Sequence, residues 1–312
     1  MHSISVVVPV YNSRDILPIL IHRLEIIMAD ISQEFEIILI NDGSIDDSWE
    51  VISGIVRDNK NIFGIDLMRN YGQHNALLCG IRKAKYEIVV TIDDDLQNPP
   101  EEIPKLIEKL CDGFDVVYGF PLEEQHGFLR DLASQFTKFA LQSTMGVESA
   151  KHVSSFRAFR TIIRDAFADY QGPFISLDVL LSWGTDRFNA IHVQHAQRIN
   201  GASNYTFQNL VSHAFNMITG FSTLPLQIAS IVGFLFTLFG LVVLVYVIGR
   251  FIIEGYSVPG FPFLASIIAI FSGVQLFALG IIGEYLARMH FRTMDKPAYT
   301  IREIYENGIN GF

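Results

Sequence analysis

The sequence predicts an α/β domain with a mostly parallel sheet, followed by a C-terminal hairpin of two transmembrane helices. Two patterns lead to this fold class. In residues 1–204, short apolar runs alternate with amphipathic stretches, as strands and helices do in parallel α/β sheets. Further on, residues 199–249 and 255–283 contain no Asp, Glu, Lys or Arg. Charge-free stretches of this length are typical of membrane spans, which need ~20 apolar residues.

The alternation of apolar and turn-forming residues locates the elements of the first domain. The expected strands are residues 4–10, 35–41, 62–67, 88–92, 116–119 and 188–199. The expected helices are residues 16–28, 46–58, 74–83, 104–111 and 128–145. In a sheet of this kind, ligands bind beyond the carboxyl ends of the strands.

Polar or turn-forming residues follow each of the first four expected strands. They read PVYN (9–12), NDGS (41–44), RNYGQHNAL (69–77) and DDDLQNPP (93–100). The carboxyl ends of parallel strands meet at one edge of the sheet, so these four segments are expected to converge. One such turn indicates little, but four at one edge predict a binding cleft.

Three consecutive carboxylates, Asp93 to Asp95, follow the expected strand 88–92. Neighbouring carboxylates disfavour each other's ionisation, so the cluster is either a solvated turn or a cation site. On an extended backbone Asp93 and Asp95 point the same way, and Asp94 turns away toward a backbone or solvent partner. Two hard oxygen ligands together with nucleotide phosphates are a usual way to hold Mg²⁺ or Mn²⁺. The double proline that follows would fix the turn and hold Gln97 near the metal.

Asp42 follows the second expected strand and precedes Gly43 and Ser44. Its carboxylate can accept hydrogen bonds from a uracil or a ribose, while the glycine permits a close turn. An Asp-Gly-Ser turn without a ligand is the alternative for this segment alone. Neither a GxxxxGK[ST] nor a GxGxxG pattern occurs, which argues against a P-loop ATPase and a dinucleotide enzyme.

The apolar part of the chain, residues 223–289, predicts two spans at about 226–248 and 261–282. The loop between them carries only Arg250, which Glu254 balances. The basic residues that follow the second span are Arg288, Arg292, Lys296 and Arg302. The positive-inside rule therefore places the tail, residues 290–312, and the N-terminal domain in the cytoplasm.

Several other features bound the function. Residues 205–222 predict an amphipathic helix, either in the membrane interface or facing the core. The N-terminus lacks a basic segment and a long apolar run, so no signal peptide is expected. Cys79 and Cys111 are too far apart for a metal-binding motif and fit a reducing compartment. The net charge of −10 argues against a nucleic-acid partner.

Four segments resemble glycosyltransferase family 2, in its polyprenyl-phosphate branch. They read VVVPVYN, NDGSIDDS, MRNYGQHNALLCG and DDDLQNPPEEIPKL, and GEYLAR follows the second span. The branch includes dolichol-phosphate mannosyltransferases and bacterial undecaprenyl-phosphate glycosyltransferases, and the resemblance covers nearly the whole chain. It implies a GT-A fold that transfers a sugar, with inversion, from a nucleotide sugar to a polyprenyl phosphate.

The resemblance also implies the partners and the location of the enzyme. A UDP-sugar is the expected donor, undecaprenyl phosphate the expected acceptor, and Mg²⁺ or Mn²⁺ the expected cofactor. The enzyme would be a multi-pass protein of the bacterial inner membrane, with its catalytic domain in the cytoplasm. The spans would anchor it and could help to assemble a homo-oligomer. The lipid-linked sugar would serve the modification of cell-envelope glycans such as lipopolysaccharide.

The family pattern implies roles for individual residues. Those implied to bind the nucleotide sugar are Pro9, Tyr11, Asn12, Asp42, Asp93, Asp94, Ser203 and Tyr205. Those implied to be catalytic are Asp93, Asp95, Gln97 and Arg198, of which Asp93, Asp95 and Gln97 would hold the metal. Arg130 and Ser134 match a pair that meets phosphate groups in the family.

The expected chemistry brings two anions together, which calls for further arginines. Arg157 and Arg160 are therefore additional candidates for the acceptor phosphate. A phosphate monoester is already anionic near neutral pH, so no general base is needed, and Asp178 is not expected to act as one. Two departures affect the donor's phosphate contacts: Asn204 stands where the family has lysine, and residues 118–124 lack the family's arginine.

Two other functions remain open from the sequence. A processive polysaccharide synthase of the same wide family would carry a QxxRW motif, which is absent here, and more than two spans. A non-enzymatic lipid-sugar carrier or flippase subunit would place functional polar groups inside its spans. Gln275, in the interior of the second predicted span, is the evident group of this kind, and it is weak support.

Overall fold

The computed structural model describes residues 2–121, 152–172, 175–196, 224–255, 260–294, 296–306 and 309–311. The chain divides into two compact units, Met1–Ala214 with Asp295–Phe312, and Phe215–Met294. The expected helices at residues 128–145 and 205–222 lie outside the described residues. Each unit is considered by itself below.

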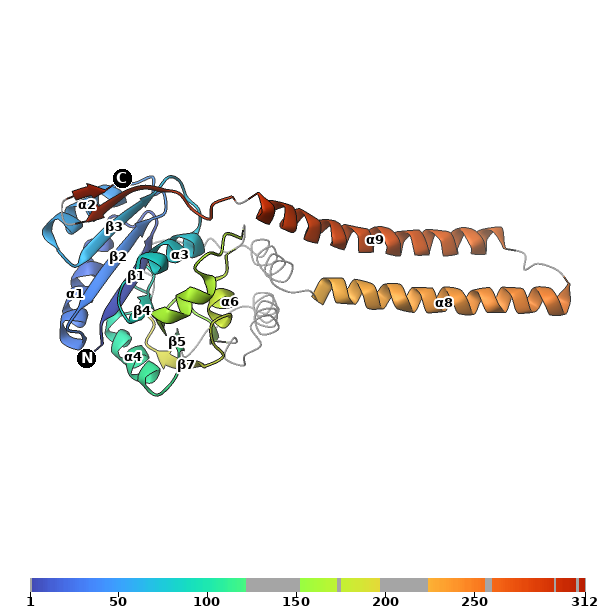
Figure 1. Cartoon of the computed structure of the whole chain (residues 1–312), viewed down its shortest axis with the longest axis horizontal. Helices are drawn as coiled ribbons and strands as arrows, with labels where there is room; N and C mark the ends of the chain where they lie inside the picture. The colour runs from blue at the N-terminus through green and yellow to red at the C-terminus, as the bar shows by residue number, and fades with distance from the viewer. Residues whose placement is uncertain are drawn as a thin grey trace. The chain divides into compact units, whose positions relative to one another are not determined.

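The first unit contains a nine-stranded mixed sheet over its described residues (Figure 1). Its strands are β1 (Ile4–Val10), β2 (Phe35–Asn41), β3 (Ile62–Leu67), β4 (Ile88–Thr91), β5 (Val116–Pro121), β6 (Arg157–Arg160), β7 (Phe188–Val193), β8 (Ile301–Glu306) and β9 (Ile309–Gly311). Their order is β7-β5-β6-β4-β1-β2-β3-β8-β9. β4, β1, β2 and β3 run parallel, as predicted, and β6 and β8 run antiparallel to their neighbours.

Helices cover both faces of this sheet. They are α1 (Leu17–Ile31), α2 (Ser48–Asp58), α3 (Gln73–Lys83), η1 (Pro100–Glu102), α4 (Ile103–Cys111), η3 (Thr161–Phe167) and α6 (Leu177–Ser182). On one face, the apolar sides of α1, α2 and α4 form one buried cluster with alternate residues of the strands, such as Val6 and Ile37. On the other face α3 lies so close that a Cβ on Gly80 would come within 2.6 Å of Val7 and Ile40. Strand alternation thus supplies two apolar faces, as an α/β sheet requires.

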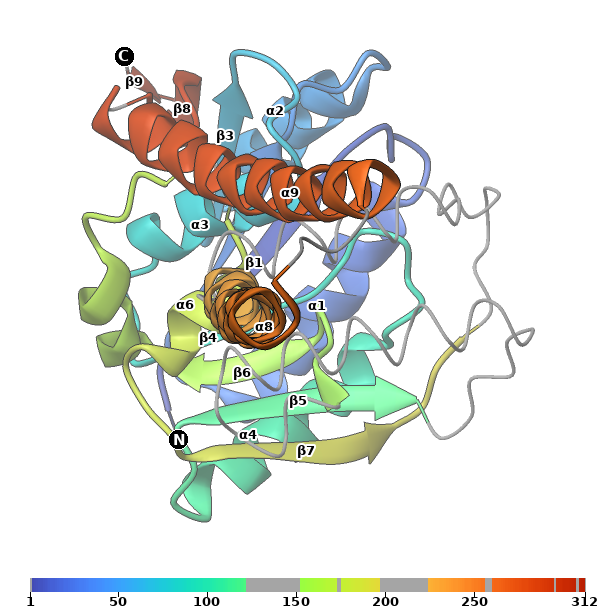
Figure 2. The same cartoon turned by 90° about the vertical axis from the view of Figure 1, so that its right-hand side faces the viewer.

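The strands and helices of the first half match the expected ranges within a few residues, which confirms the α/β class. Two parts of the sheet were not anticipated. β6 inserts between β4 and β5, so these two strands are not neighbours (Figure 2). The segment expected to be a tail after the membrane instead returns to the sheet, where β8 pairs with β3. Its alternation of apolar and polar residues was too short to stand out from a polar tail.

The second unit is a pair of long apolar helices, α8 (Leu224–Glu254) and α9 (Phe261–Thr293). They pack together where the rings of Phe236 and Phe271 meet edge to face, with centroids 5.9 Å apart. Gly240 leaves room for the Phe271 ring, which would lie 3.0 Å from a Cβ at this position. Within them, Pro225–Ile253 and Ile270–Phe291 are long and apolar enough to cross a membrane. This confirms the predicted pair of apolar C-terminal helices.

Candidate active site

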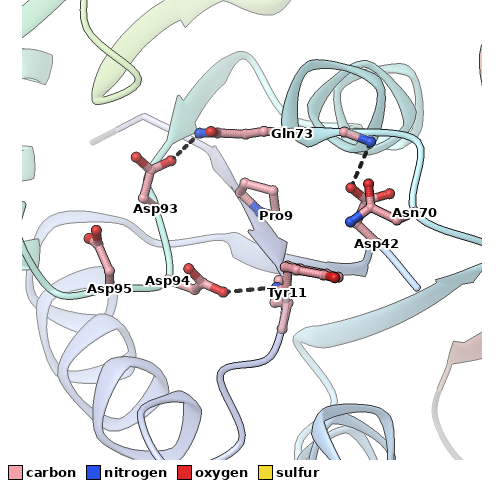
Figure 3. A pocket seen from close by; sticks show the side chains of 10 residues that line it. Pro9, Tyr11, Asp42, Asn70, Gln73, Asp93, Asp94 and Asp95 are labelled. Carbon is pink, nitrogen blue, oxygen red and sulfur yellow. Dashed lines mark hydrogen bonds between the residues drawn. The ribbon is translucent and has the colours of Figure 1, made fainter. Parts of the chain in front are cut away.

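A pocket lies at the carboxyl ends of β1 to β4, where the polar segments were expected to converge (Figure 3). Its volume is about 230 Å³. The residues that line it are Pro9, Val10, Tyr11, Asp42, Asn70, Gly72, Gln73, Asp93, Asp94 and Asp95. All four strand ends therefore contribute, which is the position of ligand sites in parallel α/β sheets.

Asn12 joins the loop after β1 to the loop after β2 through two hydrogen bonds. The backbone N–H of Asn12 donates to Ser44 Oγ at 3.0 Å, and Ile45 N–H donates to Asn12 Oδ1 at 2.9 Å. Asn12 adopts a left-handed conformation with φ 55°, which asparagine tolerates better than most residues. In this position Asn12 holds two loops in register, while the neighbouring ring of Tyr11 stays 48% exposed at the pocket.

Asp42 joins the end of β2 to the loop after β3. Its carboxylate accepts hydrogen bonds from Tyr71 N–H at 2.7 Å and from Gly72 N–H at 2.8 Å. The next residue, Gly43, has φ +64°, and a Cβ there would lie 2.4 Å from the backbone nitrogen of Asn70. Burial raises the pKa of Asp42, and the two backbone donors oppose that rise. Asp42 therefore fixes the pocket wall by accepting hydrogen bonds from the backbone of the loop after β3.

The three consecutive carboxylates lie beyond β4, which ends at Thr91, and Asp94 and Asp95 are in a turn. Asp93 accepts hydrogen bonds from Gln73 Nε2 at 2.6 Å and from Ser155 Oγ at 2.5 Å. Asp94 accepts from Tyr11 N–H at 3.0 Å and from Ser13 Oγ at 2.5 Å. In Figure 3 the Asp94 side chain extends toward Tyr11, away from the Asp93 and Asp95 carboxylates.

This arrangement agrees in part with the expectation for the cluster. Asp94 does find a backbone partner, as expected, but a turn and not strand alternation separates it from Asp93 and Asp95. Leu96, with φ 59°, closes the turn in the left-handed region. Gln97 donates its backbone N–H to Asp95 Oδ1 at 3.1 Å and accepts Ala196 N–H at 2.8 Å through its carbonyl. Gln97 therefore supports the turn, and its side chain is half-buried.

The pocket is electrostatically suited to a cation. Burial, followed by the charges of Asp95 and Asp94, raises the pKa of Asp93 to about 6, against the Ser155 hydrogen bond. Burial also raises the pKa of Asp94. Among the described residues, no group of three or more His, Cys, Asp or Glu side chains is arranged to hold a metal. Asp93 and Asp95 can thus supply two oxygen ligands, and a metal there would need further oxygens from substrate or water.

The raised pKa of Asp93 gives a pH-dependent prediction for the metal-free protein. Folding lifts this pKa from 3.8 to about 6, so the folded state disfavours the ionised form. The contribution of Asp93 to stability is then present below about pH 4 and lost as the pH rises through about 6. Asparagine does not ionise, so Asp93→Asn does not undergo this loss of stability as the pH rises. We expect its Tm, relative to wild type in EDTA, to increase between pH 4 and pH 7.

Thermal unfolding at pH 4, 5.5 and 7 tests this expectation. Asp169→Asn is the matched control, because Asp169 is exposed on the surface. A Tm difference between Asp93→Asn and wild type that is constant with pH would contradict the inferred environment of Asp93.

The candidate acceptor arginines are placed away from the pocket surface. The Arg157 side chain is 1% exposed, and its guanidinium pairs with Asp178. Arg157 Nε also donates to Thr91 Oγ1 at 3.2 Å and to the Ser155 carbonyl at 3.4 Å. Arg157 thus supports Ser155, the residue that holds Asp93, and its side chain is buried. A contact between Arg157 and the acceptor phosphate stays a prediction.

Arg160 lies at the far end of the sheet from the pocket. β6 runs antiparallel to β4, with Arg157 opposite Thr91 and Arg160 opposite Ile88. Arg160 pairs there with Glu87 at 3.2 Å and with Asp115 at 3.7 Å. The structure does not bring Arg160 to the site.

Other expected site residues lie outside the described residues. They are Arg130, Ser134, Arg198, Ser203 and Tyr205. Conversely, the structure adds pocket residues that were not assigned roles, namely Val10, Asn70, Gly72 and Gln73. Their position at or shortly after the ends of β1 and β3 was the available signal, since these strand ends were expected at the cleft. Ser13 and Ser155 carried no such signal, because only the folded chain shows that they hold carboxylates.

Comparisons with known proteins identify the family. The family model described as Glycosyl transferase family 2 matches residues 5–170. An undecaprenyl-phosphate 4-deoxy-4-formamido-L-arabinose transferase of Aeromonas hydrophila subsp. hydrophila is 36% identical over 304 residues, covering 96% of this chain and 93% of the relative. An enzyme of the same name from Enterobacter sp. is 33% identical, covering 99% of this chain and 95% of the relative.

Solved structures share the fold. A glucosyl-3-phosphoglycerate synthase from Mycobacterium tuberculosis, in complex with Mn²⁺, UDP-glucose and phosphoglyceric acid, gives a TM-score of 0.52 at 20% identity. The match covers 70% of this chain and 78% of that one, and it confirms the predicted GT-A-like fold. With the family model over more than half of its length and relatives that match it nearly end to end, the chain belongs to glycosyltransferase family 2 and is a glycosyltransferase.

Proposed function

We propose that this glycosyltransferase moves a sugar from a UDP-sugar to a polyprenyl phosphate, with inversion and with Mg²⁺ or Mn²⁺ as cofactor. One observation carries the proposal: a pocket lined by three consecutive carboxylates occurs in a chain that also has two helices of membrane-crossing length. The pocket suits a metal-bound nucleotide diphosphate. The helices suit an acceptor that lies in the membrane.

The nucleotide would lie between the ends of β1 and β2. Tyr11 offers an exposed ring face on which a base can stack, and its backbone is fixed by the bond to Asp94. Asn12 and Asp42 hold the surrounding loops through the bonds described above. Pro9 and Asn70 complete this part of the pocket wall. Rigid loops reduce the entropy that donor binding costs.

Asp93 and Asp95 are the residues that would hold the metal. They are carboxylates, which suit hard divalent cations, and Gln73 and Ser155 fix the orientation of Asp93. When bound, the metal would neutralise negative charge on the diphosphate leaving group. A cation would also offset the burial and the carboxylate repulsion that raise the pKa of Asp93. The relatives of known structure include a complex with Mn²⁺ and UDP-glucose, which supports the same cofactor class here.

The reaction proposed is a single displacement at the anomeric carbon. An oxygen of the acceptor phosphate forms a bond to this carbon as the bond to the β-phosphate oxygen of UDP breaks. The electron pair of the broken bond leaves with UDP, and the configuration inverts. The acceptor oxygen is already anionic near neutral pH, so no side chain has to remove a proton. The burial of Asp178 against Arg157 agrees with a mechanism that lacks a base.

Two observations support the proposed acceptor, the chain's apolar helices and the names of its relatives. The relatives are named undecaprenyl-phosphate transferases and match this chain nearly end to end. The basic residues in the last turns of α9 and beyond it, in contrast to the balanced charges of Arg250 and Glu254 at the end of α8, favour a catalytic domain on the cytoplasmic face. The enzyme would then act at the inner membrane of a bacterium, where that lipid phosphate is exposed to cytoplasmic nucleotide sugars.

The sugar first to be tested is 4-deoxy-4-formamido-L-arabinose, which the names of the relatives contain. Two departures from the family pattern, at Asn204 and in residues 118–124, concern the donor's phosphate groups. A panel of donors is therefore part of the assay.

The test uses the full chain in detergent with undecaprenyl phosphate, Mn²⁺ or Mg²⁺, and a panel of labelled UDP-sugars. We expect a labelled sugar to appear on the lipid with one donor, and we expect EDTA to abolish the transfer. A protein that binds a donor but transfers no sugar to the lipid would refute the proposed function. Growth of a long sugar polymer instead would identify a processive synthase.

A further inference from the structure

We propose that the segment after α9, Tyr299 to Glu306, is a positioning element of the nucleotide pocket and acts through Arg302. This segment is called the strap below. The inference rests on the proposed function, because it assumes that the pocket at the ends of β1 to β4 binds a nucleotide. It goes beyond that function by making the last segment of the chain a part of the donor site.

The strap pairs with β3 along its length. The pairing reaches the last residue of β3, Leu67, where the loop that carries Asn70 to the pocket begins. β8 runs antiparallel to β3, with Ile304 opposite Ile65, and a register shift occurs between Asp66 and Leu67. Beyond this shift, Met68 N–H donates to the Thr300 carbonyl at 2.9 Å, and Arg302 Nη2 donates to the Met68 carbonyl at 3.0 Å. Both backbone groups of Met68 are thus held by the strap. Asn70, which lines the pocket, is two residues further on.

Arg302 is also the first residue in a series of polar contacts that reaches the end of β1. Arg302 Nη1 pairs with Asp66 Oδ2 at 2.9 Å, and Asn41 Nδ2 donates to Asp66 Oδ1 at 2.6 Å. Ser44 N–H in turn donates to Asn41 Oδ1 at 3.3 Å, and Ser44 Oγ accepts Asn12 N–H at 3.0 Å. Each step joins a different strand end, so the strap's cation is connected to the loops beside Tyr11 and Asp42.

This series of contacts depends on the buried carboxylate of Asp66, which joins Arg302 to Asn41. Asp66 is 1% exposed, and burial raises its pKa while Asn41 and Arg302 lower it. Without Arg302, this carboxylate would keep Asn41 as its described side-chain donor but lose its cationic partner. A buried carboxylate in that position recruits water or a proton, and either change alters the orientation of Asn41. The loops at the ends of β1 and β2 would then lose their fixed spacing.

A second contact between the strap and the domain provides an internal comparison. Trp49 Nε1 donates to Glu303 Oε1 at 2.7 Å, and the Trp49 ring meets Tyr305 edge to face. This contact holds the strap to α2, and neither Trp49 nor Glu303 lines the pocket. If the strap acts only by stabilising the domain, weakening either contact should have similar consequences.

The experiment measures the Kd for UDP in the presence of Mn²⁺ by calorimetry on the full chain in detergent. We expect Arg302→Gln to weaken UDP binding about five- to tenfold, because its coupling to the pocket passes through several bonds. We expect the donor KM to rise by a similar factor while kcat changes little. Trp49→Phe, the matched control, removes the donor to Glu303 and should lower the Tm but leave the UDP affinity within about twofold of wild type.

The double variant Arg302→Gln/Asp66→Asn isolates the route. Asn at position 66 needs no cation and can still accept from Asn41, so we expect it to restore most of the UDP affinity. Equal affinity of Arg302→Gln and wild type would overturn the inference. An equal loss in Trp49→Phe would also overturn it, because the strap would then act through stability alone. A wild-type protein that binds UDP but transfers no sugar would refute the proposed function and leave this comparison valid.

Discussion

Asp95→Asn is expected to abolish sugar transfer while the protein stays folded. Asp95 lines the pocket beside Asp93 on the turn after β4, where the two carboxylates would hold the divalent cation. Asparagine keeps the shape of the side chain but removes a negative charge, so the cation would bind weakly. Charge stabilisation of the leaving group by the metal contributes several kcal/mol, and each 1.36 kcal/mol is a tenfold change in rate. We therefore expect a loss of about a thousandfold or more.

Two measurements separate this effect from a loss of structure. The Tm of metal-free Asp95→Asn should equal or exceed that of wild type, because the substitution removes one of three adjacent carboxylates. The Mn²⁺ affinity in the presence of UDP, measured by calorimetry, should fall together with the rate. Asp169→Asn, on the exposed surface, is the control. Turnover by Asp95→Asn at the wild-type rate would remove Asp95 from the metal site.

The fold was largely predictable because most of its elements are locally encoded. β1 to β4 and α1 to α4 each show a clear apolar period and a turn signal at their ends. β6 and β8 were missed for a physical reason. Each is a short segment that becomes a strand through pairing with β4 and β3, which are distant in the sequence. Pairing of that kind leaves almost no trace in local composition.

The site was predictable to the level of strand ends but not of partners. The parallel order of β4, β1, β2 and β3 brings Tyr11, Asp42 and Asp93 to one pocket, as expected. Which groups hold these residues depends on contacts between distant segments. Ser155, for example, is 62 residues from Asp93 in the chain, and its hydroxyl accounts for one of the two bonds to that carboxylate. A serine in an unassigned segment gives no hint of such a contact.

Arg157 is the clearest example of a contact that the sequence does not predict. An arginine in an enzyme whose expected substrates carry phosphate groups is expected to meet a phosphate, since its charge is rarely buried. The sequence does not show that Asp178 will lie against it. Once the two are paired, burial is tolerated, and the arginine becomes part of the framework behind the pocket.

Breaking this buried pair is expected to cost a large part of the protein's stability. Arg157 and Asp178 are 1% and 8% exposed, and Tyr118, itself fully buried, donates its hydroxyl to Asp178 at 3.1 Å. Asp178→Ala leaves the Arg157 cation uncompensated, which typically costs ~3–5 kcal/mol. For a domain of this size the loss corresponds to a Tm lower by about 10 °C. Thermal unfolding of the full chain in detergent measures it.

Replacing both partners distinguishes a buried charge from a packing defect. In Arg157→Met/Asp178→Leu no charge is left unpaired, so we expect most of the lost Tm to return. If the double variant is no more stable than Asp178→Ala, the cost lies in packing and not in charge.

The same aspartate also decides whether the reaction uses a general base. Asp178→Asn keeps an oxygen that can accept from Tyr118 and Arg157, so it tests the charge with little change of shape. A base would contribute ~10²–10⁴-fold to the rate, and its loss would reduce kcat by that factor at a temperature where the variant is folded. Because Asp178 is enclosed by Arg157 and Tyr118, we expect kcat to fall by less than about tenfold. In the same variant, Asp178→Asn, the Mn²⁺ affinity should weaken modestly, because Arg157 holds the Ser155 carbonyl and the Ser155 hydroxyl holds Asp93.

A hundredfold loss of kcat with unchanged Mn²⁺ affinity would instead make Asp178 the base.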